Sequence, residues 1–289
     1  MNRPTWRDIR EFEPPSKRRE PRAAFVKGSR PRCVRLVEYT QTDRHGTAGH
    51  LSGLLLDTPS EITQHDHWMP FGLPAQTRSK LPNTIASGEV DLTRPNPFLT
   101  LQESSQLATW WFGPEREGHA SHSDESTAPT WDLVATRGSK GPWETRPRGI
   151  VLVEAKAHHA EPFSRASTTS GGHQAIVINE IIGAHSNIFT PGAKYDPAIY
   201  QLLNRFAFGL KLAEFGFEVE LVFLGFLGAV EMEEPSGTSK AFDSHEAWEK
   251  HIHSKSRHVV LGSVWTSEPR KFSTGGSFRA RIRSTTVPL

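Results

Sequence analysis

The stretch RGIVLVEAKAH, residues 148–158, decides the fold of this 289-residue chain. Its centre, 150–153, is an unbroken run of aliphatic residues, which is the pattern of a strand buried on both faces. The run ends in two charged residues, Glu154 and Lys156. Because alternate residues of a strand point to the same side, these two side chains project together. We therefore predict a central buried strand that ends in an acid and an amine on one face.

Segments on both sides of this strand extend the architecture. WDLVAT (131–136) predicts a preceding strand, and EVELVFLGFLGA (218–229) predicts a second buried one. Between them, apolar residues at helical spacing predict a helix that opens at Asp196-Pro197 and stops at Gly216. This order is typical of an α/β fold with helices covering a central sheet. Other predicted elements are a hairpin within 34–56, a helix over 96–112, a partly helical region at 171–185, a helix near 244–255 and a strand at 257–264.

The composition excludes several classes of protein. Cys33 is the only cysteine, so the chain has neither an internal disulfide framework nor a cysteine-rich zinc site. No apolar run approaches the ~20 residues that a membrane helix needs. The first residues, MNRPTWRDIR, lack the apolar region of a secretory signal, so we expect a cytoplasmic protein.

The first 32 residues form a basic segment. They hold ten Arg and Lys against four acids, a net of +6, so the net charge of +2 for the whole chain leaves −4 for the remainder. Such an arm can bind phosphates by releasing counterions, and a solvated tail is the alternative. We divide the chain into a basic N-terminal arm with an irregular or β extension, 1–95, and a main domain, 96–289.

Candidate catalytic residues lie at the ends of the predicted strands. Asp132 and Glu154 supply two carboxylates, which with the backbone carbonyl beside them suit Mg²⁺ or Mn²⁺. The Lys156 ammonium could position or help to deprotonate a water and neutralise charge developing on a phosphate. This combination suits hydrolysis of a phosphodiester. The alternative is a strand-end salt bridge between Glu154 and Lys156.

These residues resemble the PD-(D/E)XK nuclease superfamily. Pro129-Thr130-Trp131-Asp132 is followed, 22 residues later, by Glu154-Ala155-Lys156, and the order of elements over about 96–262 is similar. The longer stretch 200–232 resembles a group of bacterial nuclease-like proteins. One departure is that Trp131, rather than a proline, directly precedes Asp132. The resemblance implies a restriction-endonuclease-like core over 96–289, in which helices flank a central mixed sheet.

The resemblance also implies a function. It points to a metal-dependent nuclease that hydrolyses phosphodiester bonds of nucleic acid, DNA in preference to RNA, in restriction, phage defence or repair. Asp132, Glu154 and Lys156 would be the catalytic residues, the two acids holding Mg²⁺ or Mn²⁺ and the lysine assisting the attacking water. The alternative is a nucleic-acid-binding or scaffold subunit that keeps the fold without turnover, or that acts only within a larger complex. A homodimer, or a partner protein that supplies target specificity, fits either interpretation.

Three further residues gain candidate roles from the resemblance. Glu103, an acid on the first predicted helix, would be an additional metal ligand, or else an ordinary surface residue. Gln201 would approach the active site, and Arg205 would contact a phosphate of the nucleic acid. A solvated helix face is the alternative for both of these residues.

Overall fold

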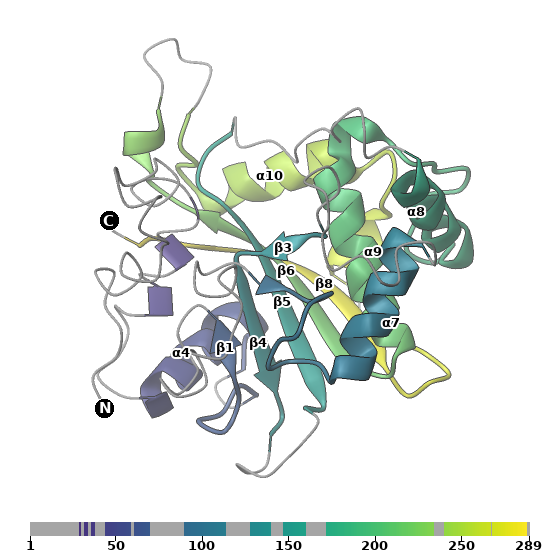
Figure 1. Ribbon diagram of the computed structural model, residues 1–289. Helices are drawn as coiled ribbons and strands as arrows, with labels where there is room; N and C mark the ends of the chain where they lie inside the picture. The colour runs from purple at the N-terminus through teal and green to yellow at the C-terminus, as the bar shows by residue number, and fades with distance from the viewer. Residues whose placement is uncertain are drawn as a thin grey trace, which may run out of the picture.

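The computed structural model describes most of the chain in separate segments, and Figure 1 shows how they are arranged. Of the predicted basic arm it describes only Ser29 and Arg32, and the buried Arg32 forms an ion pair with the exposed Glu231 at 2.5 Å. The division of the chain at residue 95 stays a prediction. The described residues are 29, 32–33, 36–37, 44–58, 61–69, 90–113, 128–139, 147–159, 172–233, 240–266 and 268–287.

A mixed six-stranded sheet forms the centre of the molecule, in the order β1-β4-β5-β6-β8-β7. Strand β4 (Leu133–Arg137) is antiparallel to β5 (Gly149–Lys156), and the strands β5, β6 (Glu218–Phe226) and β8 (Ser277–Thr285) run parallel. The edges are the short antiparallel strands β1 (Trp68–Met69) and β7 (Arg270–Lys271). A separate two-stranded sheet consists of β2 (Val90–Asp91) and β3 (Thr130–Trp131).

Helices cover both faces of the large sheet (Figure 1). On one face lies α4 (Arg44–Leu56), and on the other lie α7 (Leu101–Phe112), α8 (His173–Ala184), α9 (Tyr200–Glu214) and α10 (His245–Ser256). The described residues also form the 3₁₀ helices η3 (Pro197–Ile199), η4 (Val230–Met232) and η5 (Gly262–Trp265). The predicted α/β class, with helices flanking a central sheet, is therefore confirmed. Among the described residues, no helix is long and apolar enough to cross a membrane.

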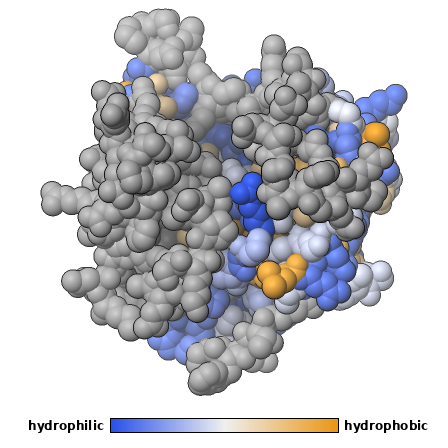
Figure 2. Space-filling model, in the orientation of Figure 1, coloured by the Kyte–Doolittle hydropathy of each residue, from blue (hydrophilic) through white to orange (hydrophobic). Residues whose placement is uncertain are grey.

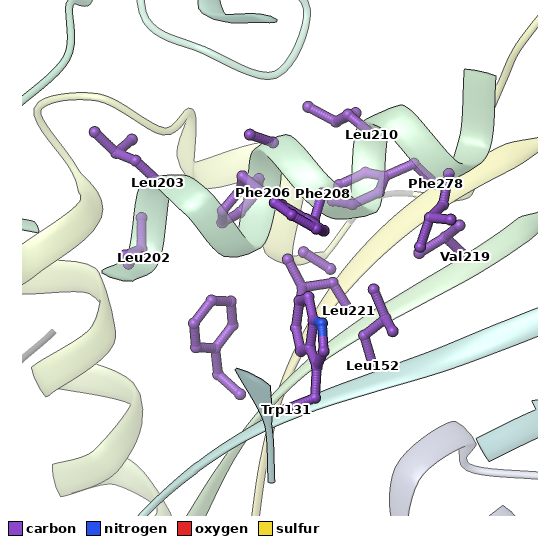
Figure 3. Close-up of a cluster of buried hydrophobic side chains, with 14 of the residues drawn as sticks. Trp131, Leu152, Leu202, Leu203, Phe206, Phe208, Leu210, Val219, Leu221 and Phe278 are labelled. Atoms are coloured by element: carbon purple, nitrogen blue, oxygen red, sulfur yellow. The ribbon is translucent and has the colours of Figure 1, made fainter. Parts of the chain in front are cut away.

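Strand β5 separates two hydrophobic cores, one on each face of the sheet. Ile150 and Leu152 pack in the core under α7–α10, whereas Val151 and Val153 pack in the core under α4. Figure 3 shows Leu152 at the sheet beneath the aromatic side chains of α9. All eight residues of β5 are buried, so the prediction of a strand buried on both faces is confirmed.

The predicted helix between Asp196-Pro197 and Gly216 is present, but its first three residues form the 3₁₀ helix η3 and α9 itself begins at Tyr200. Asp196 accepts a hydrogen bond from the N–H of Ala198 at 2.8 Å and caps η3, which leads directly into α9. At the other end, Gly216 has a φ of 94°, in the left-handed region that favours glycine. The next strand, β6, begins two residues later at Glu218.

The predicted hairpin within 34–56 is wrong, because the described residues of this segment are helical. The described residues Leu36 and Val37 are helical, and LSGLLL forms the end of α4 rather than a strand. Gly46, Gly49 and Gly53 all lie inside the helix. The side chains that α4 buries have helical spacing and are Thr47, Ala48, Leu51, Ser52, Leu55 and Leu56.

The predicted strand at 257–264 is wrong as well. This segment forms a turn, one isolated bridge between Val260 and Phe189, and the start of η5. The last parallel strand is instead β8, whose apolar residues alternate with arginines. The arginines lie on the α4 face, where Arg281 pairs with Glu220 at 2.8 Å and with Asp57 at 2.9 Å.

The described surface is mainly polar. On the face drawn in Figure 2, hydrophilic residues make up most of the coloured area and hydrophobic residues are scattered among them. Among the described residues, the large hydrophobic side chains that are exposed belong to three different elements: Leu101, Ile176 and Val230.

Candidate active site

Asp132 lies where the chain passes from the small sheet into the large one. The predicted strand over 131–136 breaks at this residue, with β3 before it and β4 after it. Because β4 pairs antiparallel with β5, Asp132 lies beside the end of β5. Its Oδ2 accepts a hydrogen bond from the N–H of Ala155 at 2.9 Å. Since Ala155 separates Glu154 from Lys156, the carboxylate of Asp132 is held at the same strand end as these two residues.

Glu154 and Lys156 are the charged residues at the end of β5. Lys156 Nζ donates to Glu154 Oε1 at 2.5 Å, and their side chains are 7% and 1% exposed. Both lie on the α9 face, as the alternation along the strand predicts. Burial of two charges costs desolvation energy, which their attraction and further hydrogen bonds have to offset.

Helix α9 supplies two of those further hydrogen bonds. Gln201 Nε2 donates to Glu154 Oε1 at 2.7 Å, and Arg205 Nε donates to Glu154 Oε2 at 2.6 Å. The two residues are four apart, so they lie one above the other on the same face of the helix. Both oxygens of the Glu154 carboxylate therefore accept hydrogen bonds from side chains of this chain.

Arg205 connects α9 to the small sheet. Its Nη2 donates to the carbonyl oxygen of Thr130 at 2.8 Å, and its Nη1 donates to Oδ1 of Asn204 at 3.1 Å. The guanidinium carbon lies 4.7 Å from the centre of the Trp131 ring, within the range of a cation–π contact. With its side chain only 4% exposed, Arg205 is fixed on several sides.

The charges of the site balance. Burial by itself raises the pKa of Glu154, but the Arg205 guanidinium and the Lys156 ammonium outweigh burial and hold this pKa below its ordinary value. Glu154 is therefore an anion at neutral pH. Counted by formal charge, the two carboxylates of Asp132 and Glu154 balance the two cations, Lys156 and Arg205.

Glu103 lies in the first turn of α7. Its Oε2 accepts hydrogen bonds from the N–H and from the hydroxyl of Thr100, each at 2.9 Å. The Thr100 hydroxyl in turn accepts from the N–H of Glu103 at 3.2 Å, which completes a capping box. The structure thus brings Asp132, Glu154, Lys156, Gln201 and Arg205 together, and it places Glu103 in the cap of α7.

The oxygen atoms at the end of β5 fit a magnesium-type ion. Within the described segments there is no group of three or more His, Cys, Asp or Glu side chains that could hold a metal. Mg²⁺, however, often binds through one or two carboxylates and keeps several waters. Asp132 and Glu154 are the two carboxylates at this strand end that could hold such an ion, and an ion at Glu154 Oε1 would have to replace one of the donors there.

The structure adds residues to the site that sequence reasoning did not assign. Arg205 contacts Glu154, and its predicted contact with a phosphate of the nucleic acid stays a prediction. Trp131, noted only as the residue before Asp132, packs against that arginine. The four-residue spacing of Gln201 and Arg205 indicates a shared helix face, but no local pattern indicates which carboxylate that face meets.

Comparison with known proteins finds no match for this chain among protein-family models, curated proteins or solved structures. What the site does is therefore inferred from its own residues and their geometry.

Proposed function

We propose that this chain is a metal-dependent nuclease that hydrolyses phosphodiester bonds of DNA, with a restriction-endonuclease-like core over residues 96–289. The observation that carries the proposal is the buried group at the end of β5. There Lys156 lies 2.5 Å from Glu154, and Asp132 binds the backbone between them. The order of elements supports the resemblance to the PD-(D/E)XK pattern: α7, the antiparallel pair β4–β5, the helices α8 and α9, and then β6 parallel to β5.

Each residue of the group has a role in this proposal. A bound Mg²⁺ or Mn²⁺ would supply a Lewis acid for the scissile phosphate and lower the pKa of a bound water. Asp132 and Glu154 present the oxygen ligands, and Gln201 orients Oε1 of Glu154. Lys156 carries a proton and a positive charge next to this ligand set. It can therefore position the attacking water and stabilise negative charge on the phosphate.

The charge balance supports a phosphate substrate. Without a cation, the two carboxylates, Lys156 and Arg205 sum to zero and offer little attraction to an anion. With a divalent cation the same site carries a net positive charge in a largely buried environment, where electrostatic attraction is stronger than in water. Binding of the scissile phosphate at this site is therefore expected to depend on the metal.

A second candidate function has an observation in its favour. Both oxygens of Glu154 already accept hydrogen bonds from Lys156, Gln201 and Arg205. Such a carboxylate also suits a protein that keeps the nuclease fold to bind nucleic acid or to act as a scaffold. In that case turnover would be absent, or would arise only within a larger complex.

Cleavage assays test the proposal. The purified chain is incubated with supercoiled, linear and single-stranded DNA and with RNA, each in Mg²⁺, Mn²⁺ or EDTA. We expect cleavage of DNA that EDTA abolishes, and loss of cleavage in Asp132→Asn and Glu154→Gln. The matched control is Glu220→Gln. Glu220 is a buried carboxylate on the neighbouring strand β6, paired with Arg281 on the opposite face of the sheet.

The remaining arms separate the alternatives. Wild-type cleavage by Glu154→Gln would overturn the proposal, and DNA binding without cleavage in any metal would support the scaffold. Glu103→Gln keeps full cleavage if its carboxylate serves only the helix cap, and it loses cleavage if the carboxylate is a metal ligand.

A further inference from the structure

Glu154 divides its two oxygens between two kinds of partner. Oε2 accepts from Arg205, and Oε1 accepts from Lys156 and Gln201. We propose that Arg205 is a permanent positioning residue for Glu154, whereas Lys156 occupies the place of a divalent cation at Oε1 and leaves it when the cation binds. This inference rests on the proposed metal-dependent function.

Several contacts make Arg205 a permanent partner. Its three guanidinium nitrogens donate to Glu154 Oε2, the Thr130 carbonyl and Asn204 Oδ1, while Trp131 packs against the guanidinium. A guanidinium is planar and keeps its charge at all accessible pH values, so these bonds set its orientation together. Displacing Arg205 from Glu154 would disturb all of these contacts. Its position therefore fixes Oε2 and leaves Oε1 as the oxygen that can change partners.

Lys156 has the opposite character. Its ammonium is a point charge on a flexible stem of four carbons, and it can reorient without moving the backbone. It lies 2.5 Å from Oε1, whereas Mg²⁺ binds carboxylate oxygens at about 2.0–2.1 Å. An ammonium and a dication at one oxygen would repel each other at short range. The ammonium must therefore withdraw from Oε1 as the cation binds, and it is then free to approach the water or phosphate.

The two cationic side chains are expected to have opposite effects on metal affinity. Simple electrostatics predicts that removing either positive charge strengthens binding of a dication. If Lys156 competes for Oε1, its removal does strengthen binding. If Arg205 positions the ligand, its removal weakens binding despite the lost repulsion, because Glu154 is no longer held in place. Opposite signs therefore distinguish the proposal from a general charge effect.

Titration of the full-length chain with Mn²⁺, followed by calorimetry without nucleic acid, measures both effects. Lys156→Met is expected to bind on the order of tenfold more tightly, equivalent to removing about 1.4 kcal/mol of competition. Arg205→Met is expected to bind about 10–100-fold more weakly, the usual effect of losing a residue that orients a metal ligand. The matched control is Arg281→Met, which removes an arginine paired with the buried Glu220 on the opposite face and leaves Mn²⁺ affinity unchanged.

Arg205→Lys keeps the test valid if Arg205→Met does not fold, as circular dichroism will show. It retains the charge but not the three-way donor geometry, so it is expected to fold and to bind Mn²⁺ more weakly than wild type. Tighter or unchanged binding in the arginine variants would overturn the positioning role, and weaker binding in Lys156→Met would overturn the competition. Absence of Mn²⁺ binding by the folded wild type would instead overturn the proposed function itself.

Discussion

Replacing Glu154 with alanine tests how strongly this carboxylate holds the fold together. The change leaves Lys156 and Arg205, whose side chains are 7% and 4% exposed, without their buried counter-ion. Lys156 can lose its proton, but Arg205 cannot, and it keeps only its bonds to Thr130 and Asn204. Removing one partner of a buried pair costs about 3–5 kcal/mol. We expect a loss of this size in the free energy of unfolding, measured by urea denaturation.

Thermal melting gives a second measure of the same loss. At roughly 2–4 °C for each kcal/mol in chains approaching this size, Tm should fall by about 6 °C or more. Glu220→Ala is the matched control, because Glu220 is equally buried and pairs with Arg281 at 2.8 Å and with Arg137 at 3.7 Å. It should cost a comparable amount. A Glu154→Ala protein within about 0.5 kcal/mol of wild type, the range of ordinary surface substitutions, would refute this reasoning.

Two further predictions concern other parts of the fold. Burial, together with the neighbouring His159, lowers the pKa of His251 from 6.5 to about 4. The folded state therefore favours the neutral imidazole, and this contribution to stability is complete above pH 6.5 and lost as the pH falls towards 4. Tm should fall less over that range in His251→Gln than in wild type, and parallel curves would contradict this. Gly225→Ala would place a Cβ 2.6 Å from the Trp248 ring and should cost about 1–3 kcal/mol. Gly53 lies inside α4, and a Cβ added there would have no neighbouring atom within 4 Å. Gly53→Ala should therefore raise the free energy of unfolding by about 0.5–1 kcal/mol. Thermal melts in which both glycine variants shift in the same direction would refute these two predictions.

Local sequence patterns correctly predicted strand β5 and helix α9. Strand β5 is buried on both faces, so an unbroken run of four aliphatic residues identifies it. No knowledge of the elements packed against it is needed. The segment of η3 and α9 combines a clear helical period with an aspartate that caps η3 and a glycine just after α9. Each of these signals depends only on residues inside or next to the element.

The elements that were missed depend on distant partners. The arginines of β8 look like surface residues until Glu220 and Asp57 are known to face them, one from β6 and one from the residue after α4. Helix α4 was mistaken for part of a hairpin because two short apolar runs, VRLVEY and LSGLLL, flank a polar segment, although that segment enters the helix. In both cases tertiary packing decided what local propensity left open.

The candidate site shows the same division. The two-residue spacing of Glu154 and Lys156 was enough to predict that they project to one side of a strand. The contact between Glu154 and Arg205 spans 51 residues of sequence, so no local rule predicts it. The role of Trp131 depends on that contact and was equally out of reach.

The long connection between Arg205 and Glu154 has a consequence for the order in which the site can form. The hairpin β4–β5 joins segments close in sequence and brings Asp132 to the strand end of Glu154 and Lys156. Local pairings of this kind close early, because little chain entropy is lost in forming them. In the sequence, α8 lies between β5 and α9. Arg205 therefore reaches Glu154 only when α9 docks on the sheet. A partly folded chain therefore holds the acidic residues without the arginine that orients Glu154. The capacity to bind a cation in a defined geometry is acquired only with the completed fold.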